Sequence, residues 1–404
     1  KLEYDINTSN WLIIEPTFSF RKGQSSNSSA LEQTGALRQD QRNNSDNNNK
    51  TPNYGLKLNY GRKLNEKGTT LSLQINTNNN NTNQERIAIN NISYFDYING
   101  SLLKDSLLHR NINVDNLNEN YRGSLTFSHP VSEKSRLEFN GQVNYRGYDN
   151  NQVTNVLNAD GNFYVIDSLS RIFNYSFTES RFALNYRFTQ TKYNFSLGLT
   201  AIPGVLKGFS QTLNSETYRS SFNLVPIFRF EYKWSRQKNF SVYYTGNPTE
   251  PSYEQIQDVP DVTNPQNIVV GNPDLKAAFR HSIQARFNNY ITNSKLNYYA
   301  GLNTTYYENQ IIRNVVFVPD DFNSRKRETR FINSSGNYTY RGNYGISKRL
   351  ADNKYTIGLN GTIGFNRTMS MNDYVRNVGK NWDFNQRFNF QIDPNEWLEI
   401  NPNV

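Results

Sequence analysis

Apolar and polar residues alternate strictly along many separate stretches of this chain. In Thr70–Asn76, the apolar residues Leu71, Leu73 and Ile75 alternate with polar ones. The same pattern runs through three longer stretches, Arg136–Arg146, Arg181–Thr189 and Lys354–Asn366. Successive side chains of a strand point to opposite faces, so each stretch predicts a strand with one apolar and one strongly polar face.

Extended to the whole chain, the pattern predicts about fifteen strands. They lie near 11–20, 53–60, 69–76, 121–129, 136–146, 181–188, 193–200, 222–232, 240–245, 281–290, 295–306, 329–350, 354–367, 382–392 and 396–404. Several reach the roughly 9–11 residues that a tilted strand needs to cross a bilayer.

The connections between these strands alternate between short and long. Short connections are expected at 61–68, 130–135, 189–192, 233–239, 291–294, 351–353 and 393–395. Long ones are expected at 21–52, 77–120, 147–180, 201–221, 246–280, 307–328 and 368–381. Bacterial outer-membrane barrels have short periplasmic turns and long extracellular loops. The sequence therefore predicts an all-β fold, an antiparallel meander transmembrane β-barrel.

Two asparagine-rich tracts, 43–49 and 78–81, fall within the long connections. Such tracts bury little apolar surface, so we expect mobile loop tips there. Aromatic residues near the strand ends are candidates for the girdles of such a barrel, although ordinary cross-strand packing would also place aromatics there. They are Trp11, Phe20, Tyr60, Trp234, Tyr298, Tyr306, Trp382 and Trp397.

The composition of the chain argues against several other classes of protein. The 404 residues are 35% hydrophobic, with a mean hydropathy of −0.80, yet 14% are aromatic, which is too many for a disordered chain. The sequence contains no apolar run long enough for a spanning helix and no cysteine. The three histidines are scattered and no catalytic motif is present, so we expect neither an enzyme nor a cofactor or metal site. The net charge of +9 is dispersed, which argues against nucleic acid as a partner.

The polar strand faces carry many charges that would be costly against lipid, roughly 2–4 kcal/mol each at the bilayer midplane. These faces therefore point into the lumen and the apolar faces contact outer-membrane lipid. The charges are Lys57, Arg122, Arg136, Glu138, Arg146, Arg181, Arg187, Arg229, Glu231, Arg286 and Lys348. They either attract an anionic solute or form a hydrated wall whose charges pair with one another or with a plug.

A motif lies in the expected long connection 246–280. It begins with Pro251, Ser252 and Gln255, continues with Asn264 and Pro265, and ends with Gly271, Asn272, Pro273, Asp274, Leu275 and Lys276. It resembles the outer-membrane β-barrel family of TonB-dependent-receptor type that is abundant in the Bacteroidetes. The family usually continues with Pro-Glu, where this chain has Ala277-Ala278. The prolines and Gly271 by themselves indicate a structured loop, which either shapes the barrel rim or contacts ligand.

The resemblance implies more than the residues do. It places the motif outside the cell and implies a barrel of twenty-two strands, with a plug domain and an N-terminal regulatory-like domain. Residues 1–404 are then expected to be a barrel segment without the plug, the regulatory-like domain and the final strands. It also implies energised uptake of an unidentified solute across the outer membrane, driven by the TonB machinery. An outer-membrane scaffold or adhesion barrel, and a secreted carbohydrate-binding protein, stay open as alternatives.

Overall fold

One large sheet dominates the protein. The computed structural model describes residues 1–34, 38–96, 98–212, 214–257, 260–261, 267–318, 326–395 and 398–402. The strands are β1 (Leu2–Asn7), β2 (Asn10–Gln33), β3 (Arg38–Lys63), β4 (Thr70–Phe95), β5 (Leu102–Pro130), β6 (Ser135–Leu157), β7 (Phe163–Val165), β8 (Arg171–Thr189), β9 (Tyr193–Ser210), β10 (Ser215–Lys233), β11 (Lys238–Thr249), β12 (Asn267–Val270), β13 (Ala278–Ile291), β14 (Leu296–Glu308), β15 (Gln310–Phe317), β16 (Arg327–Ser334), β17 (Asn337–Leu350), β18 (Tyr355–Asn372), β19 (Val375–Asn395) and β20 (Leu398–Ile400). A 3-10 turn, η1 (Asp167–Leu169), and a short helix, α1 (Tyr253–Ile256), interrupt the connections.

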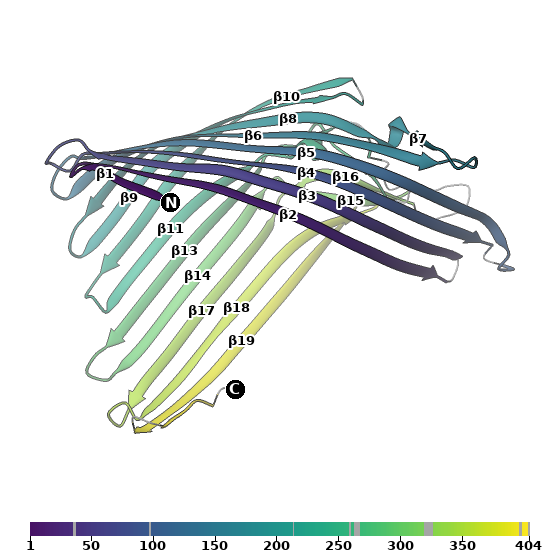
Figure 1. Ribbon diagram of the computed structural model, residues 1–404. Helices are drawn as coiled ribbons and strands as arrows, with labels where there is room; N and C mark the ends of the chain where they lie inside the picture. The colour runs from purple at the N-terminus through teal and green to yellow at the C-terminus, as the bar shows by residue number, and fades with distance from the viewer. Residues whose placement is uncertain are drawn as a thin grey trace.

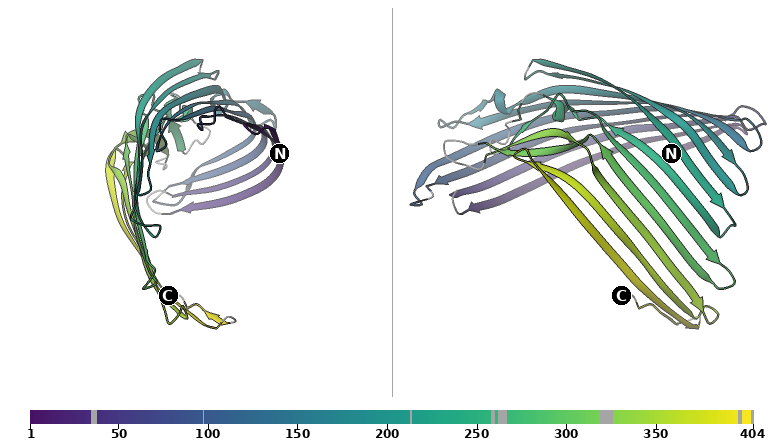
Figure 2. Two further views of the ribbon diagram at one scale, coloured as in Figure 1. Left: turned by 90° about the vertical axis from the view of Figure 1, so that its left-hand side faces the viewer. Right: turned by 180° about the vertical axis from the view of Figure 1, so that it is seen from behind.

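The long strands form an antiparallel meander. Each of β2–β6, β8–β11, β13, β14 and β17–β19 pairs with the next in this series. The strands twist and splay along the series, and the end-on view shows a strongly curved, open arc with the two termini far apart (Figures 1 and 2). All fifteen predicted strands coincide at least in part with observed ones, which confirms the all-β meander.

The two faces of the sheet differ as the alternation requires. Phe127, Phe139, Leu184 and Leu199 lie directly opposite one another on four neighbouring strands. Phe139 is 37% and Leu184 52% exposed, so no layer of described residues covers this face. The loop segments β15 and β16 lie on the other side, within the arc (Figure 2). The apolar face is therefore the convex one, and only lipid can shield it from water.

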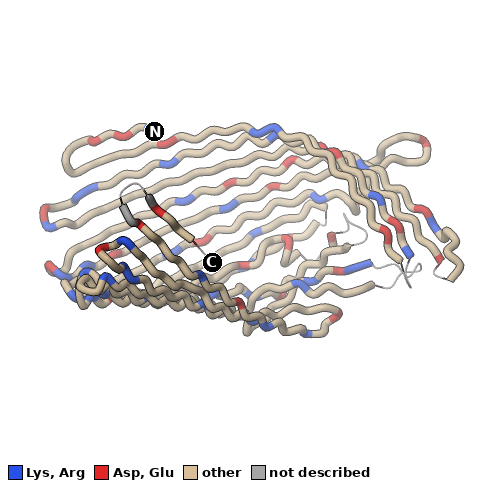
Figure 3. Tube along the Cα trace, turned by 90° about the horizontal axis from the view of Figure 1, so that it is seen from below, with Lys and Arg blue, Asp and Glu red and all other residues tan. Residues whose placement is uncertain are grey.

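The concave face carries the predicted lumen charges, and several of them pair. Arg187 lies 3.4 Å from Glu138, and Lys57 lies 3.4 Å from Glu15. Charged residues are spread over the whole trace rather than gathered in one block (Figure 3). Lys348 is an error in the predicted set, because it shares the convex face with Ile346. It lies near a short turn, where a lysine stem can follow apolar surface while the ammonium reaches water.

Aromatic rings form two rows on the convex face. The row beside the short turns joins Tyr232, Trp234, Phe287 and Tyr298, with ring centroids 4.8, 6.1 and 5.9 Å apart in sequence. The second row lies farther from the short turns, and we call it the outer aromatic row. It contains His281 and Tyr306, 6.0 Å apart, and Phe365 and Trp382, 4.6 Å apart. From Tyr298 to Tyr306 the strand advances roughly 26 Å at about 3.3 Å per residue. The nine residues from Tyr298 to Tyr306 match the roughly 9–11 residues that a tilted strand needs to cross a bilayer.

The girdle interpretation fails for one candidate and is open for another. Trp11 lies on the concave face over Gly61, where an added Cβ would be 2.2 Å from the indole. Trp397 lies outside the described residues.

The prediction of long connections is wrong at 21–52, 77–120, 147–180, 201–221 and 368–381, because most residues of each range lie in strands. Both asparagine-rich tracts lie in paired strands, 43–49 in β3 and 78–81 in β4. Amide side chains link these strands, since Asn90 Nδ2 donates to Asn43 Oδ1 at 2.6 Å and Gln84 Nε2 to Asn47 Oδ1 at 3.2 Å. Beyond the outer aromatic row both faces meet water, so alternation disappears although pairing continues.

The single strand predicted at 329–350 is in fact two strands, β16 and β17. Gly336, with φ +95°, turns the chain between them. β16 pairs with β15 and, in parallel, with β12, which builds a small layer inside the arc. Six of the seven short connections are confirmed, as the gaps between β3 and β4, β5 and β6, and β8 and β9 show. The prediction is wrong for 393–395, which lies at the end of β19. Among the described residues, no helix has the length and apolarity that would let it cross a membrane.

Candidate functional site

The motif segment folds back inside the arc and is anchored by an aromatic stack. Tyr253, in α1, is only 1% exposed. Its ring lies 5.1 Å from that of Phe173 and 5.5 Å from that of Tyr175, both on the concave face of β8. A Cβ at Gly208 would come within 2.4 Å of the Tyr253 ring, so glycine is needed for this approach. The stack joins the motif to the wall of the sheet.

The first half of the motif builds α1. Pro251 is buried before the helix begins. The Ser252 backbone N–H donates to Gln255 Oε1 at 3.0 Å, which satisfies one of the free donors at the helix start. The Asn272 backbone N–H then donates to the Gln255 carbonyl at 2.7 Å. This bond joins the two halves of the motif.

The second half depends on a close backbone approach. A Cβ at Gly271 would lie 2.1 Å from the carbonyl oxygen of Gln257, so only glycine fits. Asn272 Nδ2 donates to the Phe331 carbonyl of β16 at 3.0 Å, and its Oδ1 accepts from the Asp274 N–H at 2.9 Å. Asn272 therefore holds the turn and ties it to β16.

Leu275 and Lys276 complete the attachment. Leu275 is fully buried in an apolar cluster with Phe177, Leu206, Ile256 and Phe331. The Lys276 backbone is held at both ends, because its N–H donates to Asn333 Oδ1 at 2.7 Å and its carbonyl accepts from Asn333 Nδ2 at 2.9 Å.

The structure brings the motif residues together, with Pro251, Leu275 and the Tyr253 ring buried. The side chains of Ser252, Pro273, Asp274 and Lys276 stay exposed. The expected Asn264-Pro265 element lies outside the described residues.

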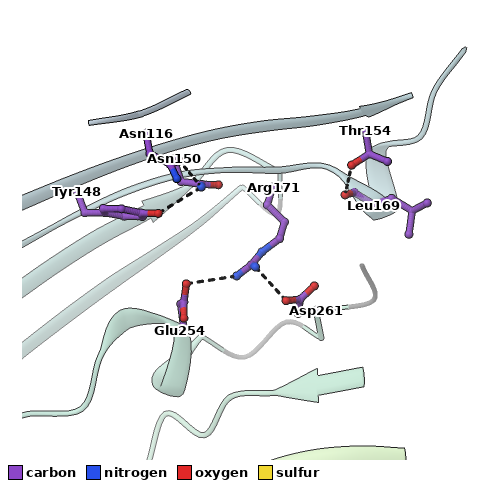
Figure 4. A network of polar contacts seen from close by, with 8 residues as sticks. All are labelled: Asn116, Tyr148, Asn150, Thr154, Leu169, Arg171, Glu254 and Asp261. Atoms are coloured by element: carbon purple, nitrogen blue, oxygen red, sulfur yellow. Dashed lines mark hydrogen bonds and ion pairs between the residues drawn. The ribbon is translucent and has the colours of Figure 1, made fainter. Parts of the chain in front are cut away.

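An ion pair adds a polar attachment (Figure 4). Arg171 Nη1, at the start of β8, lies 2.9 Å from Asp261 Oδ2, and its Nη2 lies 4.0 Å from Glu254 Oε1. The guanidinium also lies 5.6 Å from the Phe173 ring centre. Arg171 therefore contacts both the loop and the aromatic stack.

Neighbouring strands extend this network. Asn150 Nδ2 donates to Asn116 Oδ1 at 2.6 Å and lies 3.5 Å from the Tyr148 hydroxyl. Thr154 Oγ1 donates to the Leu169 carbonyl at 2.8 Å and so holds η1 (Figure 4). Burial raises the pKa of Tyr148 and the pKa of Tyr253 above the ordinary tyrosine value.

A cavity of about 680 Å³ lies between this network and the outer halves of β2–β6. We call it the upper basin. Most of its wall is amide and hydroxyl groups, and Arg86, Arg110 and Arg171 outnumber the one carboxylate, Glu254. Pockets of roughly 300–1,000 Å³ enclose ligands of drug size. The upper basin can therefore hold a small polar solute.

The described part of the chain contains no group of three histidine or carboxylate side chains that could hold a metal ion. The amide, hydroxyl and guanidinium groups of the upper basin suit reversible binding through hydrogen bonds and charge. Sequence reasoning did not identify Arg171, Arg86 or Arg110 as site residues. Arg171 and Asp261 are 90 positions apart, and no local pattern joins them.

The geometry agrees with a family comparison. Residues 62–404 match the profile described as the Outer membrane protein beta-barrel family. The chain belongs to this family. Membership of the outer membrane protein β-barrel family confirms the expected fold and places the protein in the bacterial outer membrane. No curated protein matches the chain.

A solved structure shows the same fold. The structure titled "Copper transporter OprC" has a TM-score of 0.50 at 10% identity, covering 96% of this chain and 61% of that one. The FrpB iron transporter from Neisseria meningitidis (F3-3 variant) has a TM-score of 0.43 at 10% identity, covering 98% of this chain and 68% of the transporter. The chain thus spans less than two thirds of the copper transporter's length.

Proposed function

We propose that this protein is the barrel part of a receptor for energised uptake of a solute across the outer membrane. One observation carries the proposal. The upper basin opens on the polar concave face, and an anchored loop forms part of its wall. A barrel without a binding role would not need a polar cavity of about 680 Å³ lined by residues as far apart in the sequence as Asn27 and Glu254. The solute would bind in the upper basin first and then cross the membrane along the charged concave face of the membrane-spanning strands.

The energy source belongs to the same proposal. The motif resembles that of TonB-dependent receptors, in which a plug fills the lumen and the inner-membrane TonB machinery does the work. Residues 1–404 would form the barrel segment of such a protein, and a plug, a regulatory-like domain and further strands would complete it. The open arc of the sheet supports this, because an edge strand inside a bilayer needs a partner for its backbone groups (Figure 2).

Comparative metabolite depletion tests the proposal without a known solute. Three strains are grown in one complex medium: the parent, a deletion of the gene, and a strain without functional TonB. We expect the same solutes to remain in the medium of both mutants while the parent removes them. If the deletion strain depletes the medium as the parent does, the proposal is wrong.

A scaffold or adhesion role is the second candidate. The observation that favours it is the height of the wall, since β3, β4 and β5 contain 26, 26 and 29 residues, far more than a bilayer crossing needs. In the same deletion strain, loss of attachment to surfaces with unchanged depletion would support this role over uptake.

A further inference from the structure

Two arginines project into the upper basin from neighbouring strands. Arg86 of β4 pairs across the sheet with Ile112, two positions from Arg110 of β5, so the arginines are diagonal neighbours on one face. Diagonal neighbours lie roughly 7–8 Å apart, within reach of long side chains. Arg110 is only 7% exposed, and its Nη2 donates to Asn90 Oδ1 at 2.6 Å. Its guanidinium is therefore held in place at the basin wall.

The surroundings of Arg110 disfavour its positive charge. Burial, and then the nearby charge of Arg86, lower the pKa of the Arg110 guanidinium. An anion placed between the two side chains would reverse both effects. Guanidinium groups bind carboxylates through two parallel hydrogen bonds, which fixes orientation as well as charge. Arg171 does not share this role, because Asp261 and Glu254 already engage it.

A hydrogen-bond acceptor lies further along the same concave wall, on β6 next to β5. Asn150 is 9% exposed, and its Nδ2 is committed to Asn116. Its Oδ1 is buried and has no partner among the described residues. Buried amide oxygens are normally satisfied, so this atom is available to accept a hydrogen bond from a bound molecule or from water. The adjacent Tyr148 ring adds an aromatic surface to the same wall.

From this arrangement we infer that the upper basin binds a short acidic oligosaccharide. A sugar carboxylate lies between Arg86 and Arg110, and sugar hydroxyls donate to Asn150 and exchange hydrogen bonds with the surrounding amides. The volume of about 680 Å³ suits a few sugar rings rather than a polymer. The inference rests on the proposed function, because it names the solute class of the same site.

The test compares two trisaccharides that differ only at C6. Full-length protein in detergent is titrated calorimetrically with α-1,4-trigalacturonate and with α-1,4-galactotriose. We expect the acid to bind at least tenfold more tightly at low salt, and this preference to shrink as salt rises. Arg86→Gln and Arg110→Gln should each weaken acid binding about tenfold or more and leave the neutral sugar unaffected. Arg42→Gln, on the exposed convex side of β3, removes the same charge and should change nothing.

Several results would overturn the inference. These are equal binding of the two sugars, equal weakening by Arg42→Gln, or inorganic phosphate binding as tightly as the trisaccharide acid. If Arg110→Gln fails to fold, as judged by heat-modifiable gel migration, the exposed Arg86→Gln still decides. Binding without metabolite depletion would count against uptake alone, and depletion of neutral solutes without acid binding would count against this inference alone.

Discussion

The ring of Tyr253 stacks on the ring of Phe173, with 5.1 Å between centroids and 22° between planes. The two residues are 80 positions apart, and their contact turns a long connection into part of the barrel wall. The Tyr175 ring continues the stack at 5.5 Å. The buried aromatic side chain of Tyr253 is therefore a main attachment of the motif loop to the sheet.

Replacing Tyr253 by alanine should release the loop. Truncating a buried aromatic costs about 3–5 kcal/mol. We expect trypsin to cleave after the exposed Lys276 on intact cells at least 100-fold faster in Tyr253→Ala. Fragment masses over time measure the rate. Tyr253→Phe keeps the stack and should be cleaved nearly as slowly as the parent, and equal rates for all three proteins would contradict the anchoring role.

Alkaline pH should loosen the same loop. The folded pKa of Tyr253 is raised, first by burial, while hydrogen bonds from Ser210 and Thr217 and the charge of Arg171 oppose this. A raised folded pKa means that its stabilisation is complete below the ordinary tyrosine pKa, near 10, and is lost as pH rises through the folded value. The tyrosinate absorbance of the parent minus that of Tyr253→Phe should show one group that titrates above pH 10. A titration at the ordinary value would speak against burial.

Gly271→Ala should destabilise the loop through its backbone. The new Cβ would meet the Gln257 carbonyl at 2.1 Å, and relieving such crowding costs about 1–3 kcal/mol. Gly123→Ala is the matched control, because a Cβ there meets nothing within 4 Å. Hydrogen exchange of the 251–277 backbone should speed up in the first variant and stay unchanged in the second. Protection that is identical in both would rule out the crowding.

Leu199 tests which face meets lipid. It lies on the convex face of β9, midway between Tyr193 and Val205. Val205 pairs with Thr178 at the level of the outer aromatic row. Leu199→Arg should cost roughly 2–4 kcal/mol, the expected penalty near the bilayer midplane. Thr200→Arg, on the concave face, should cost far less. Guanidinium unfolding from lipid vesicles measures both, and the reverse order would invert the assignment of faces.

The sequence was informative where the two faces have different surroundings. Leu71, Leu73 and Ile75 face lipid while their neighbours face the lumen, so alternation located β4. The outer half of β4 was missed, since Asn78 and Asn79 meet water on both faces and leave no periodic signal. There, continued register with β3 and β5 decides the structure.

The site could be predicted only in part. Gly271 and Asn272 stood out through the motif, and both have demanding backbone roles. Their partners did not, because Asn333 and Phe331 sit in a hairpin that no local pattern links to the motif. Nothing in the sequence distinguishes Arg110 from the other dispersed charges. The register between β4 and β5 is what places it next to Arg86. Contacts between distant strands depend on how the sheet curls, which a single sequence does not encode locally.

β5 extends far beyond the aromatic residues that mark the membrane boundary. From Tyr121, which stacks on Tyr145 at 6.0 Å, the strand continues to Leu102, roughly 60 Å further at about 3.3 Å per residue. In the proposed receptor, a solute bound in the upper basin would lie well outside the bilayer, so substitutions in the basin would change binding without altering the strands that cross the membrane.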